Sequence, residues 1–264
     1  MHIRIVEFPV VVFAVAFAAM WVATLGGFLL SKRVRPMDEA ERGDFSVILT
    51  GTLTLLGLII GFTFSMAVSR YDLRKYYEEA EANAIGTEYV RVGLLPVSTV
   101  PRVRELLINY LDLRIAFYET SGLSRGASRR LTDIDNRTQQ LQSQMWSLIQ
   151  SSIAGGTATM ALAATGMNDV LNSEGYTQAA WLNRVPEAAW ILMALIALWS
   201  NLLIGFSSRH LRSLLMIVLP IVLAISFFLI ADIDSPRDGL IRVPPENLLS
   251  LSASLNTHQS RNQP

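Results

Sequence analysis

The sequence predicts an all-α membrane protein with four transmembrane helices and a helical extramembrane domain between the second and the third. Three observations predict this class. Only 17% of the 264 residues are charged and 51% are hydrophobic, whereas soluble domains average about 25% charged residues. Four stretches of about 20 residues contain no charge, which is the length that a helix needs to cross a bilayer. Most charges fall between the second and third stretches, where apolar residues recur at helical spacing.

The four uncharged stretches are the predicted spans, because a helix satisfies all its backbone polar groups within the lipid. Buried helices of a soluble core are the alternative, but such helices rarely run this long without a charge. The first stretch could also be a signal peptide, yet it is longer than the roughly 7–15 residues of a signal core, so we predict a retained anchor. The predicted spans are residues 8–31, 45–69, 188–208 and 213–231.

The spans divide the chain into four parts. An even number of spans places both termini and the extramembrane domain on one side of the membrane. Lys and Arg are almost equally frequent beside the spans on the two sides, and their density in the short loops favours cytoplasmic loops, so the sidedness stays open. The parts are residues 1–69 with two spans, 70–187 as the extramembrane domain, 188–231 with two spans, and 232–264 as a signature and polar tail.

Helical patterns also divide the extramembrane domain. The predicted helices are residues 72–95, a helix that starts after residue 99, residues 128–152 and residues 157–184. The last of these begins with ATMALAATG and could be a fifth span. It is short and rich in Thr and Gly, which favours a tightly packed helix instead. The polar tail, residues 252–264, is predicted to be disordered.

The sequence contains no recognised catalytic or cofactor-binding motif. There is no cysteine, and the three histidines lie far apart without a metal-ligand spacing. Phosphate-binding glycine loops and the nucleophile elbow of α/β-hydrolases are also missing. We therefore predict no enzyme activity, no cofactor and no metal site. The net charge is zero, which gives no reason to expect a nucleic-acid partner.

The second span carries the candidate pore-lining residues. Thr54, Leu58 and Phe62 recur every four residues and therefore share one helix face. Such a face could form a hydrophobic constriction around the axis of an oligomeric pore. Small and hydroxyl residues in the same span also suit close helix packing in lipid. This spacing leaves both a pore lining and a plain helix–helix interface open.

The second span leaves the bilayer where the charges begin. We predict a pore mouth at Arg70, Asp72 and Glu78. Around a symmetry axis, rings of acidic residues would favour cations, and rings of basic residues would favour anions. The alternative is a solvated helix stabilised by pairs four residues apart, such as Arg74 and Glu78.

A short signature follows the last span at Asp232, Asp234, Pro236 and Gly239. Proline and glycine after a span predict a turn, and aspartates stay outside the hydrocarbon. The two carboxylates could instead help to bind a cation or pair with Arg70. The combination of residues favours the turn.

Three stretches resemble a known family. GFTFSMAVSRYDLRKYYEEAE, residues 61–81, resembles the second membrane helix of bestrophins. MNDVLNSEGYTQAAWLNRVPEAAW and FFLIADIDSPRDGLIRVPPENL, residues 167–190 and 227–248, resemble the bacterial bestrophin-like membrane proteins, a family described as a domain of unknown function. That family has an Arg-x-Pro-x-x-x-Trp entry to the third span and an acidic-x-Asp-x-Pro-x-x-Gly signature after the fourth. The matching residues are Arg184, Pro186, Trp190, Asp232, Asp234, Pro236, Gly239 and Val243.

The resemblance implies an ion-channel architecture: a pentamer with a helical domain below the membrane and a neck lined by the second span. It implies neck positions at Thr54, Leu58 and Phe62 and places both termini in the cytoplasm. At Thr54 the sequence departs from the apolar residue that bestrophins have there. It also lacks the run of consecutive acidic residues that forms the calcium clasp of animal bestrophins, so no calcium site is implied.

Our leading functional hypothesis is a passive ion channel, a multi-pass protein of a bacterial inner membrane. The expected partners are the lipid bilayer, inorganic ions and further copies of the same chain in a homo-oligomer. The alternative is a non-conducting membrane scaffold that docks a partner on its central helices. Ion flux through liposomes that contain the purified protein separates the two hypotheses.

Overall fold

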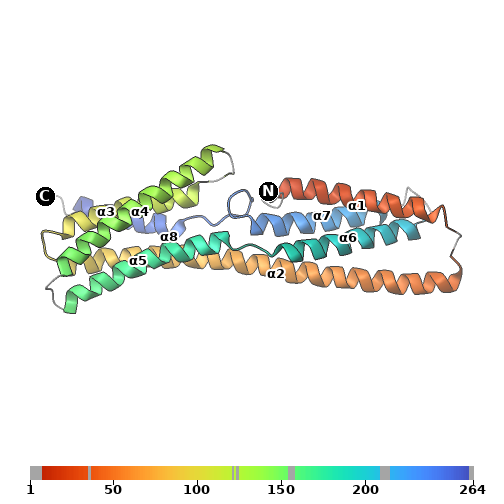
Figure 1. Ribbon diagram of the computed structural model, residues 1–264, viewed down its shortest axis with the longest axis horizontal. Helices are drawn as coiled ribbons and strands as arrows, with labels where there is room; N and C mark the ends of the chain where they lie inside the picture. The colour runs from red at the N-terminus through yellow and green to blue at the C-terminus, as the bar shows by residue number, and fades with distance from the viewer. Residues whose placement is uncertain are drawn as a thin grey trace. The chain divides into compact units, whose positions relative to one another are not determined.

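Figure 1 shows the computed structural model, which describes residues 8–34, 37–120, 122, 125–153, 158–208 and 215–261. All regular structure in these ranges is helical, which confirms the predicted all-α class. The chain forms two compact units. The membrane unit consists of Met1–Arg70 and Arg184–Ile241, and the bundle unit consists of Tyr71–Asn183 and Arg242–Pro264.

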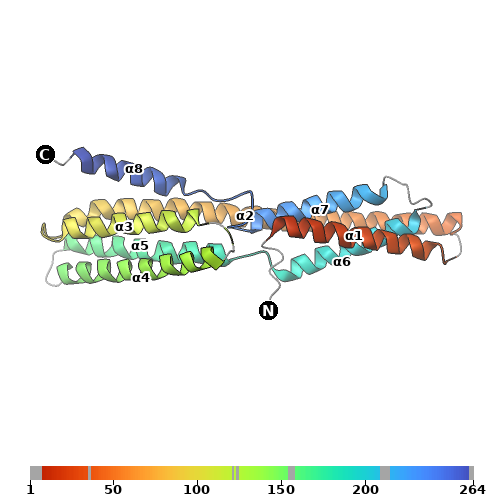
Figure 2. The same cartoon turned by 90° about the horizontal axis from the view of Figure 1, so that it is seen from above.

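The membrane unit contains the apolar helices. Four segments of the described chain are long and apolar enough to cross a membrane, and each overlaps one predicted span. Residues 213 and 214 of the last predicted span lie outside the described residues. Within this unit α1 packs on α6 and α7 (Figure 2). The helices are α1 (Pro9–Ser31), the first part of α2 (Glu39–Arg91), α6 (Glu187–Ser207) and α7 (Leu215–Asp234).

Helices α1 and α6 approach each other through glycine. An ideal Cβ on Gly27 would lie 2.0 Å from the carbonyl oxygen of Leu202, and one on Gly205 would lie 1.9 Å from that of Thr24. The Thr24 hydroxyl also donates a hydrogen bond to Asn201 Oδ1 at 3.3 Å. Small residues permit this close backbone approach in lipid, where dispersion contacts and interhelical hydrogen bonds hold helices together.

The bundle unit is a set of helices around one apolar core. Leu107, Leu111, Met145, Ile149 and Met167 are fully buried in it. Because α5 supplies part of this core, the tightly packed helix is confirmed in place of the fifth span. Figures 1 and 2 show these helices side by side. They are the second part of α2, α3 (Val100–Glu119), α4 (Arg125–Ile153), α5 (Ala158–Leu182) and α8 (Glu246–Arg261).

Two expectations differ from the structure. The second span and the next predicted helix form one helix, because α2 continues without a break as far as Arg91 and a short 3-10 turn, Val92–Leu94, follows. The prediction of a disordered tail is wrong for residues 252–261, which belong to α8. Leu248 and Leu255 of α8 are buried in the bundle core, and this burial outweighs the polar composition of the segment. Residues 262–264 lie outside the described residues.

Candidate functional site

The predicted pore-lining residues lie on one exposed face of α2. Thr54 is exposed, and the exposed fractions of Leu58 and Phe62 are 53% and 65%. The opposite face packs within the membrane unit, where Leu56 and Ala67 are buried. In lipid a single exposed Phe needs no explanation. A polar threonine and two bulky apolar side chains in one row give a face that water, lipid or a second chain can cover.

Three glycines lie on or beside the same exposed face of α2. Nothing lies within 4 Å of an ideal Cβ on Gly51, Gly57 or Gly61. The Thr54 hydroxyl donates to the carbonyl oxygen of Thr50 at 2.9 Å, so it satisfies its hydrogen within its own helix. It keeps lone pairs that can accept from water, which suits a position that is wet at least part of the time.

In the bundle unit α2 again has an exposed and a buried face. Asp72, Tyr76, Glu79, Asn83 and Thr87 are exposed and recur at intervals of three or four residues, so they form one stripe. Asp72 and Glu79 are the charged members of this stripe. Lys75 is also exposed, but it lies to one side of the stripe. The opposite face carries the buried residues Arg74, Glu78, Glu81, Ile85 and Glu88.

Glu78, predicted as a mouth residue, holds α8 in place instead. Its side chain is buried, and its Oε1 accepts hydrogen bonds from the backbone N–H groups of Asn247 and Leu248 at 2.9 and 3.0 Å. Its Oε2 accepts from Asn247 Nδ2 at 2.6 Å. These are unpaired donors of the first turn of α8, and a carboxylate is favourable at the positive end of a helix dipole. In this conformation the Glu78 carboxylate faces protein rather than solvent.

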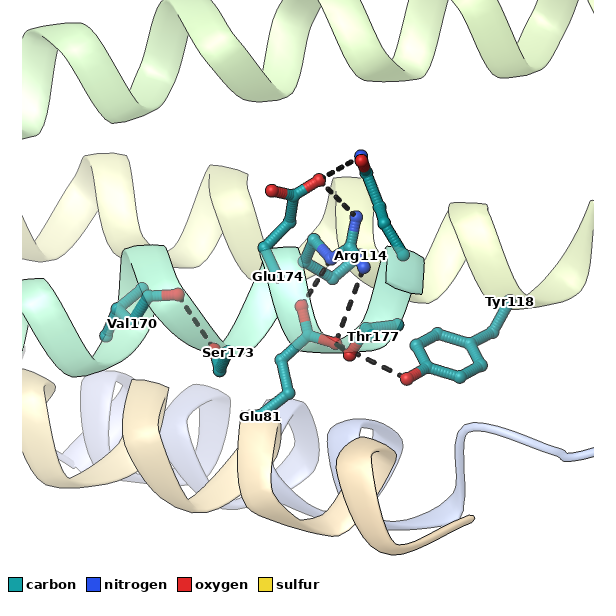
Figure 3. A network of polar contacts seen from close by, with 8 residues as sticks. Glu81, Arg114, Tyr118, Val170, Ser173, Glu174 and Thr177 are labelled. Atoms are coloured by element: carbon teal, nitrogen blue, oxygen red, sulfur yellow. Dashed lines mark hydrogen bonds and ion pairs between the residues drawn. The ribbon is translucent and has the colours of Figure 1, made fainter. Parts of the chain in front are cut away.

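A buried ionic network ties α2, α3 and α5 together (Figure 3). Arg114 Nε donates to Glu81 Oε1, and the side chains of both residues are fully buried. The hydroxyls of Tyr118 and Thr177 donate to Glu81 Oε2 at 3.4 and 3.1 Å. Glu174 Oε1 lies 3.8 Å from Arg114 Nη1. One guanidinium therefore stands between two carboxylates in the bundle core.

The protonation states of this network follow from its geometry. Burial by itself would lower the pKa of Arg114, but the charge and hydrogen bond of Glu81, together with Tyr110 and Glu174, outweigh burial and the pKa is raised, so Arg114 stays charged. Burial raises the pKa of Tyr118, and the charge on Glu81 raises it further, so the phenol keeps its proton and donates. Burial also raises the pKa of Glu174, which Arg114 partly counteracts. The network is a structural anchor for α2, because Glu81 of α2 pairs with Arg114 of α3 and accepts from Thr177 of α5.

One further buried carboxyl on α2 lacks such support. Glu88 is buried against α5, where an ideal Cβ on Gly166 would lie 2.0 Å from Glu88 Oε2. Neither carboxyl oxygen has a hydrogen-bond partner among the described residues. Burial raises the pKa of Glu88 to about 8, against the lowering effect of Arg91, while Asp169 adds to the rise. Glu88 therefore carries a proton over much of the neutral range.

The signature begins in the last turn of α7 and forms a backbone turn. Asp232 accepts hydrogen bonds from the N–H groups of Leu240 and Ile241 at 2.6 and 2.9 Å. Gly239 passes so close that an ideal Cβ would lie 2.4 Å from the carbonyl oxygen of Asp232. These contacts are what the turn interpretation predicts, and they make glycine necessary at position 239.

The second aspartate of the signature links α7 to the start of α6. Asp234 Oδ1 accepts from the N–H of Val185 at 3.0 Å, and its carbonyl oxygen accepts from Arg184 Nη1 at 2.9 Å. Pro236 is buried beside them. Arg184, which matches the family pattern before α6, and Asp234, which matches the pattern at the end of α7, are therefore in contact. Within the described part of the chain, no group of three or more histidine and acidic residues could hold a metal ion.

The Glu81–Arg114 pair was not among the residues predicted from the sequence. A signal was present, because Arg114 follows Leu107 and Leu111 on the apolar stripe of the second extramembrane helix. A charged residue at a core position of an amphipathic helix predicts a buried partner of opposite charge. The partner itself, seven residues before Glu88 on another helix, could not be chosen among several glutamates from spacing alone.

Comparison with known proteins adds a family and a fold. The sequence profile of the bestrophin-like domain matches residues 14–248. No curated protein matches the chain. Two crystal structures of a bacterial bestrophin homolog from Klebsiella pneumoniae, with the mutations L177T and I180A, align with TM-scores of 0.63 and 0.61 at 14% sequence identity. Each alignment covers 97% of this chain and 99% of the other. At this identity the likeness shows a common fold.

Proposed function

Because the chain belongs to the bestrophin-like family, we propose that this multi-pass membrane protein is a passive ion channel whose pore is lined by α2 of several identical subunits. The observation that carries the proposal is the exposed row of Thr54, Leu58 and Phe62, opposite the face by which α2 packs in its own subunit. Around a symmetry axis this row would give three successive rings. The pentamer is the symmetry that the family resemblance suggests, and a bacterial inner membrane is the location that we propose.

The rings differ in chemistry. A ring of Thr54 offers hydroxyl oxygens to water, whereas rings of Leu58 and Phe62 would form an apolar constriction that resists wetting. Phe62 is the bulkier and the more exposed of the two, at 65%. We therefore assign the narrowest point of the proposed pore to Phe62.

The exposed stripe on the bundle part of α2 supports a preference for cations. Its charged members, Asp72 and Glu79, are both acidic, while Arg74 is buried on the opposite face. Repeated around an axis, they would form two negative rings, which attract cations and repel anions. The proposed mouth therefore contains Asp72 from our sequence-based set, with Glu79 in place of the buried Glu78. Arg70 lies four residues before Arg74, on the other side of α2, and does not belong to the stripe.

Purified protein reconstituted in liposomes tests the proposal. Native mass spectrometry gives the number of subunits, and a fluorescent indicator gives the flux of K⁺ and Cl⁻. We expect Phe62→Ala to raise K⁺ flux several-fold. Val22→Ala is the matched control, because Val22 is equally exposed at 65% and lies on another helix, α1. Equal flux from both variants would remove Phe62 from the pore.

The mouth is tested by selectivity. We expect Asp72→Asn and Glu79→Gln to lower the ratio of K⁺ to Cl⁻ permeability, because each removes one negative charge per subunit. Lys75→Gln removes an exposed positive charge beside the stripe and should therefore shift the ratio in the opposite direction, toward K⁺.

Absence of flux would favour the scaffold. If the purified protein forms a closed oligomer that passes neither ion, the channel proposal fails. Exposed apolar side chains of the bundle unit would then be the first candidates for a partner surface, since Val97 and Leu182 are 87% and 80% exposed.

A further inference from the structure

The membrane unit has an apolar cavity of about 330 Å³ between α1, α6 and α7. Four alanines line it together with larger apolar side chains, among them Val12, Met20, Trp190 and Leu198. All its described lining residues belong to these three helices, and none belongs to α2, which lines the proposed pore.

Small side chains keep this cavity open. Near their ends α1 and α6 approach each other through the backbone at Gly27 and Gly205. Nearer their starts both helices place alanines in the cavity wall, Ala16 and Ala19 on α1 and Ala194 on α6. The methyl groups of these alanines do not fill the space between their larger neighbours. An empty gap forfeits the dispersion contacts of its lining, so an occupant of the right chemistry is favoured.

The wall of the cavity suits hydrocarbon. Among the described lining residues, Trp190 supplies the only side-chain N–H, and that nitrogen is itself buried. The Trp190 ring makes a T-shaped contact with the ring of Phe227, with 6.2 Å between the ring centres. A buried water needs two to four polar partners, and this wall does not provide them.

The length and depth of the cavity match one leaflet of a bilayer. Val12 lies three residues after the first residue of α1, and Trp190 lies three residues after the first residue of α6. Met20 and Leu198 line the other end, eight residues further along each helix, or about 12 Å at 1.5 Å per residue. One leaflet contributes about half of the roughly 30 Å hydrocarbon core. The cavity therefore runs from the level where both helices begin toward the middle of the membrane.

We infer that the cavity binds one acyl chain of a membrane phospholipid, with the ester group at the level of Trp190 and the chain end near Met20 and Leu198. A chain in this position contacts side chains of three helices. Protein interiors are packed more densely than organic liquids, so the chain gains contacts that it lacks among other lipids. A side chain from a second copy would fill only part of a cavity about 12 Å long. The bound chain would complete the packing of α1 against α6 and α7, independently of the proposed pore.

Native mass spectrometry of the detergent-purified full-length protein tests the inference, with dioleoyl phosphatidylcholine as the probe. We expect the first lipid on each subunit to bind about tenfold more weakly to Ala19→Leu than to the wild type, because the added side chain occupies part of the cavity. Ala18→Leu is the matched control, since Ala18 is the neighbouring residue, is also exposed and does not line the cavity. Equal binding by the two variants would overturn the assignment.

Photolabelling of the wild type locates the chain without any substitution. One phosphatidylcholine carries a diazirine beside the ester, and a second carries it at the end of the acyl chain. The first should label Val12 or Trp190, and the second should label Met20 or Leu198. Labels spread evenly over the exposed apolar residues of all four spans would mean general contact with lipid and would refute a specific site.

Two further arms separate the other possible occupants. If laurate displaces the phospholipid at equal concentration, the occupant is a free fatty acid and the phospholipid assignment is wrong. The chain has no cysteine, so Ala19→Cys introduces a single thiol at the cavity. A disulfide between two copies of this variant in native membranes would show that another subunit covers the cavity, which also refutes the assignment.

Discussion

Replacement of Gly27 by alanine should separate α1 from α6. An ideal Cβ at this position would lie 2.0 Å from the carbonyl oxygen of Leu202 and 2.9 Å from the backbone nitrogen of Phe206. Ordinary van der Waals contact begins at 3.4 Å, so the shortfall is about 1.4 Å. Both obstacles are backbone atoms of a helix and cannot rotate away. The whole of α6 must shift relative to α1.

The expected cost has two parts. Overpacking of a well-packed contact costs about 1–3 kcal/mol. A shift of this size also breaks the hydrogen bond between Thr24 and Asn201, and such bonds in membrane proteins contribute about 0.6 kcal/mol on average. We therefore expect a loss of about 2–3 kcal/mol. Gly26→Ala is the matched control, since nothing lies within 4 Å of its added Cβ and alanine favours the helix by up to about 1 kcal/mol.

Thermal unfolding followed by intrinsic tryptophan fluorescence measures the effect, because the chain has five tryptophans. At about 2–4 °C per kcal/mol, Gly27→Ala should lower the melting temperature by roughly 4–12 °C, and Gly26→Ala should leave it unchanged or raise it slightly. Gly205→Ala should resemble Gly27→Ala, and the double variant should cost less than the sum, since one displacement relieves both clashes. Equal melting temperatures of the Gly27→Ala and Gly26→Ala variants would refute the close contact between α1 and α6.

Three more predictions concern single side chains. The pKa of Glu88 is about 8 in the folded state against a usual value of 4.5, so between these pH values the folded state binds more protons than the unfolded state. The melting temperature should therefore fall as the pH rises from 5 to 8. Glu88→Gln should flatten this dependence and should melt at a higher temperature than the wild type at pH 8. Arg114→Leu leaves the Glu81 carboxylate buried without its cation and should destabilise the protein by about 3–5 kcal/mol in urea titration, whereas the added substitution Glu81→Leu should restore most of the loss. Gly239→Ala places a Cβ 2.4 Å from the Asp232 carbonyl oxygen and should lower the melting temperature, with Gly175→Ala as a control free of neighbours; an unchanged temperature would contradict the tight turn.

The membrane helices were predictable because lipid imposes a simple rule on composition. Uncharged stretches of about 20 residues located all four spans, and the first span was predicted to end at the residue where α1 ends, Ser31. The helices of the bundle were predictable from the apolar period of 3.6 residues. Burial that depends on tertiary packing was not predictable. The polar sequence after residue 252 carried too few apolar residues to predict order, yet Leu255 and the carboxylate of Glu78 hold α8 in the bundle.

The sequence alone could not predict which glutamate of the candidate site, Glu78 or Glu79, is exposed. Glu78 and Glu79 are neighbours in a cluster of acidic residues, and composition gives no reason to prefer either as a mouth residue. One residue turns a helix by about 100°, which is enough to place Glu78 against α8 and Glu79 in solvent. The choice depends on which face of α2 is occupied by packing, and that is fixed by residues far away in the chain, such as Asn247.

The contacts on the buried face of α2 also determine which charged residues lie on its exposed face. Within the bundle unit Glu78 binds the first turn of α8, Glu81 binds Arg114 of α3, and Glu88 presses against Gly166 of α5. Three carboxyl groups at spacings of three and seven residues thus fix the rotation of this segment about its own axis against three different helices. A rotation by a single residue would bring Arg74 toward the stripe and bury Glu79. If α2 lines a pore, the sign of the charge at its mouth is therefore set by contacts on the far side of the helix, and Glu81→Gln should alter ion selectivity without touching the permeating ion. Permeability ratios for K⁺ and Cl⁻ in reconstituted Glu81→Gln protein measure this coupling, and a ratio identical to that of the wild type in a correctly assembled oligomer would show that the rotation of α2 is fixed elsewhere.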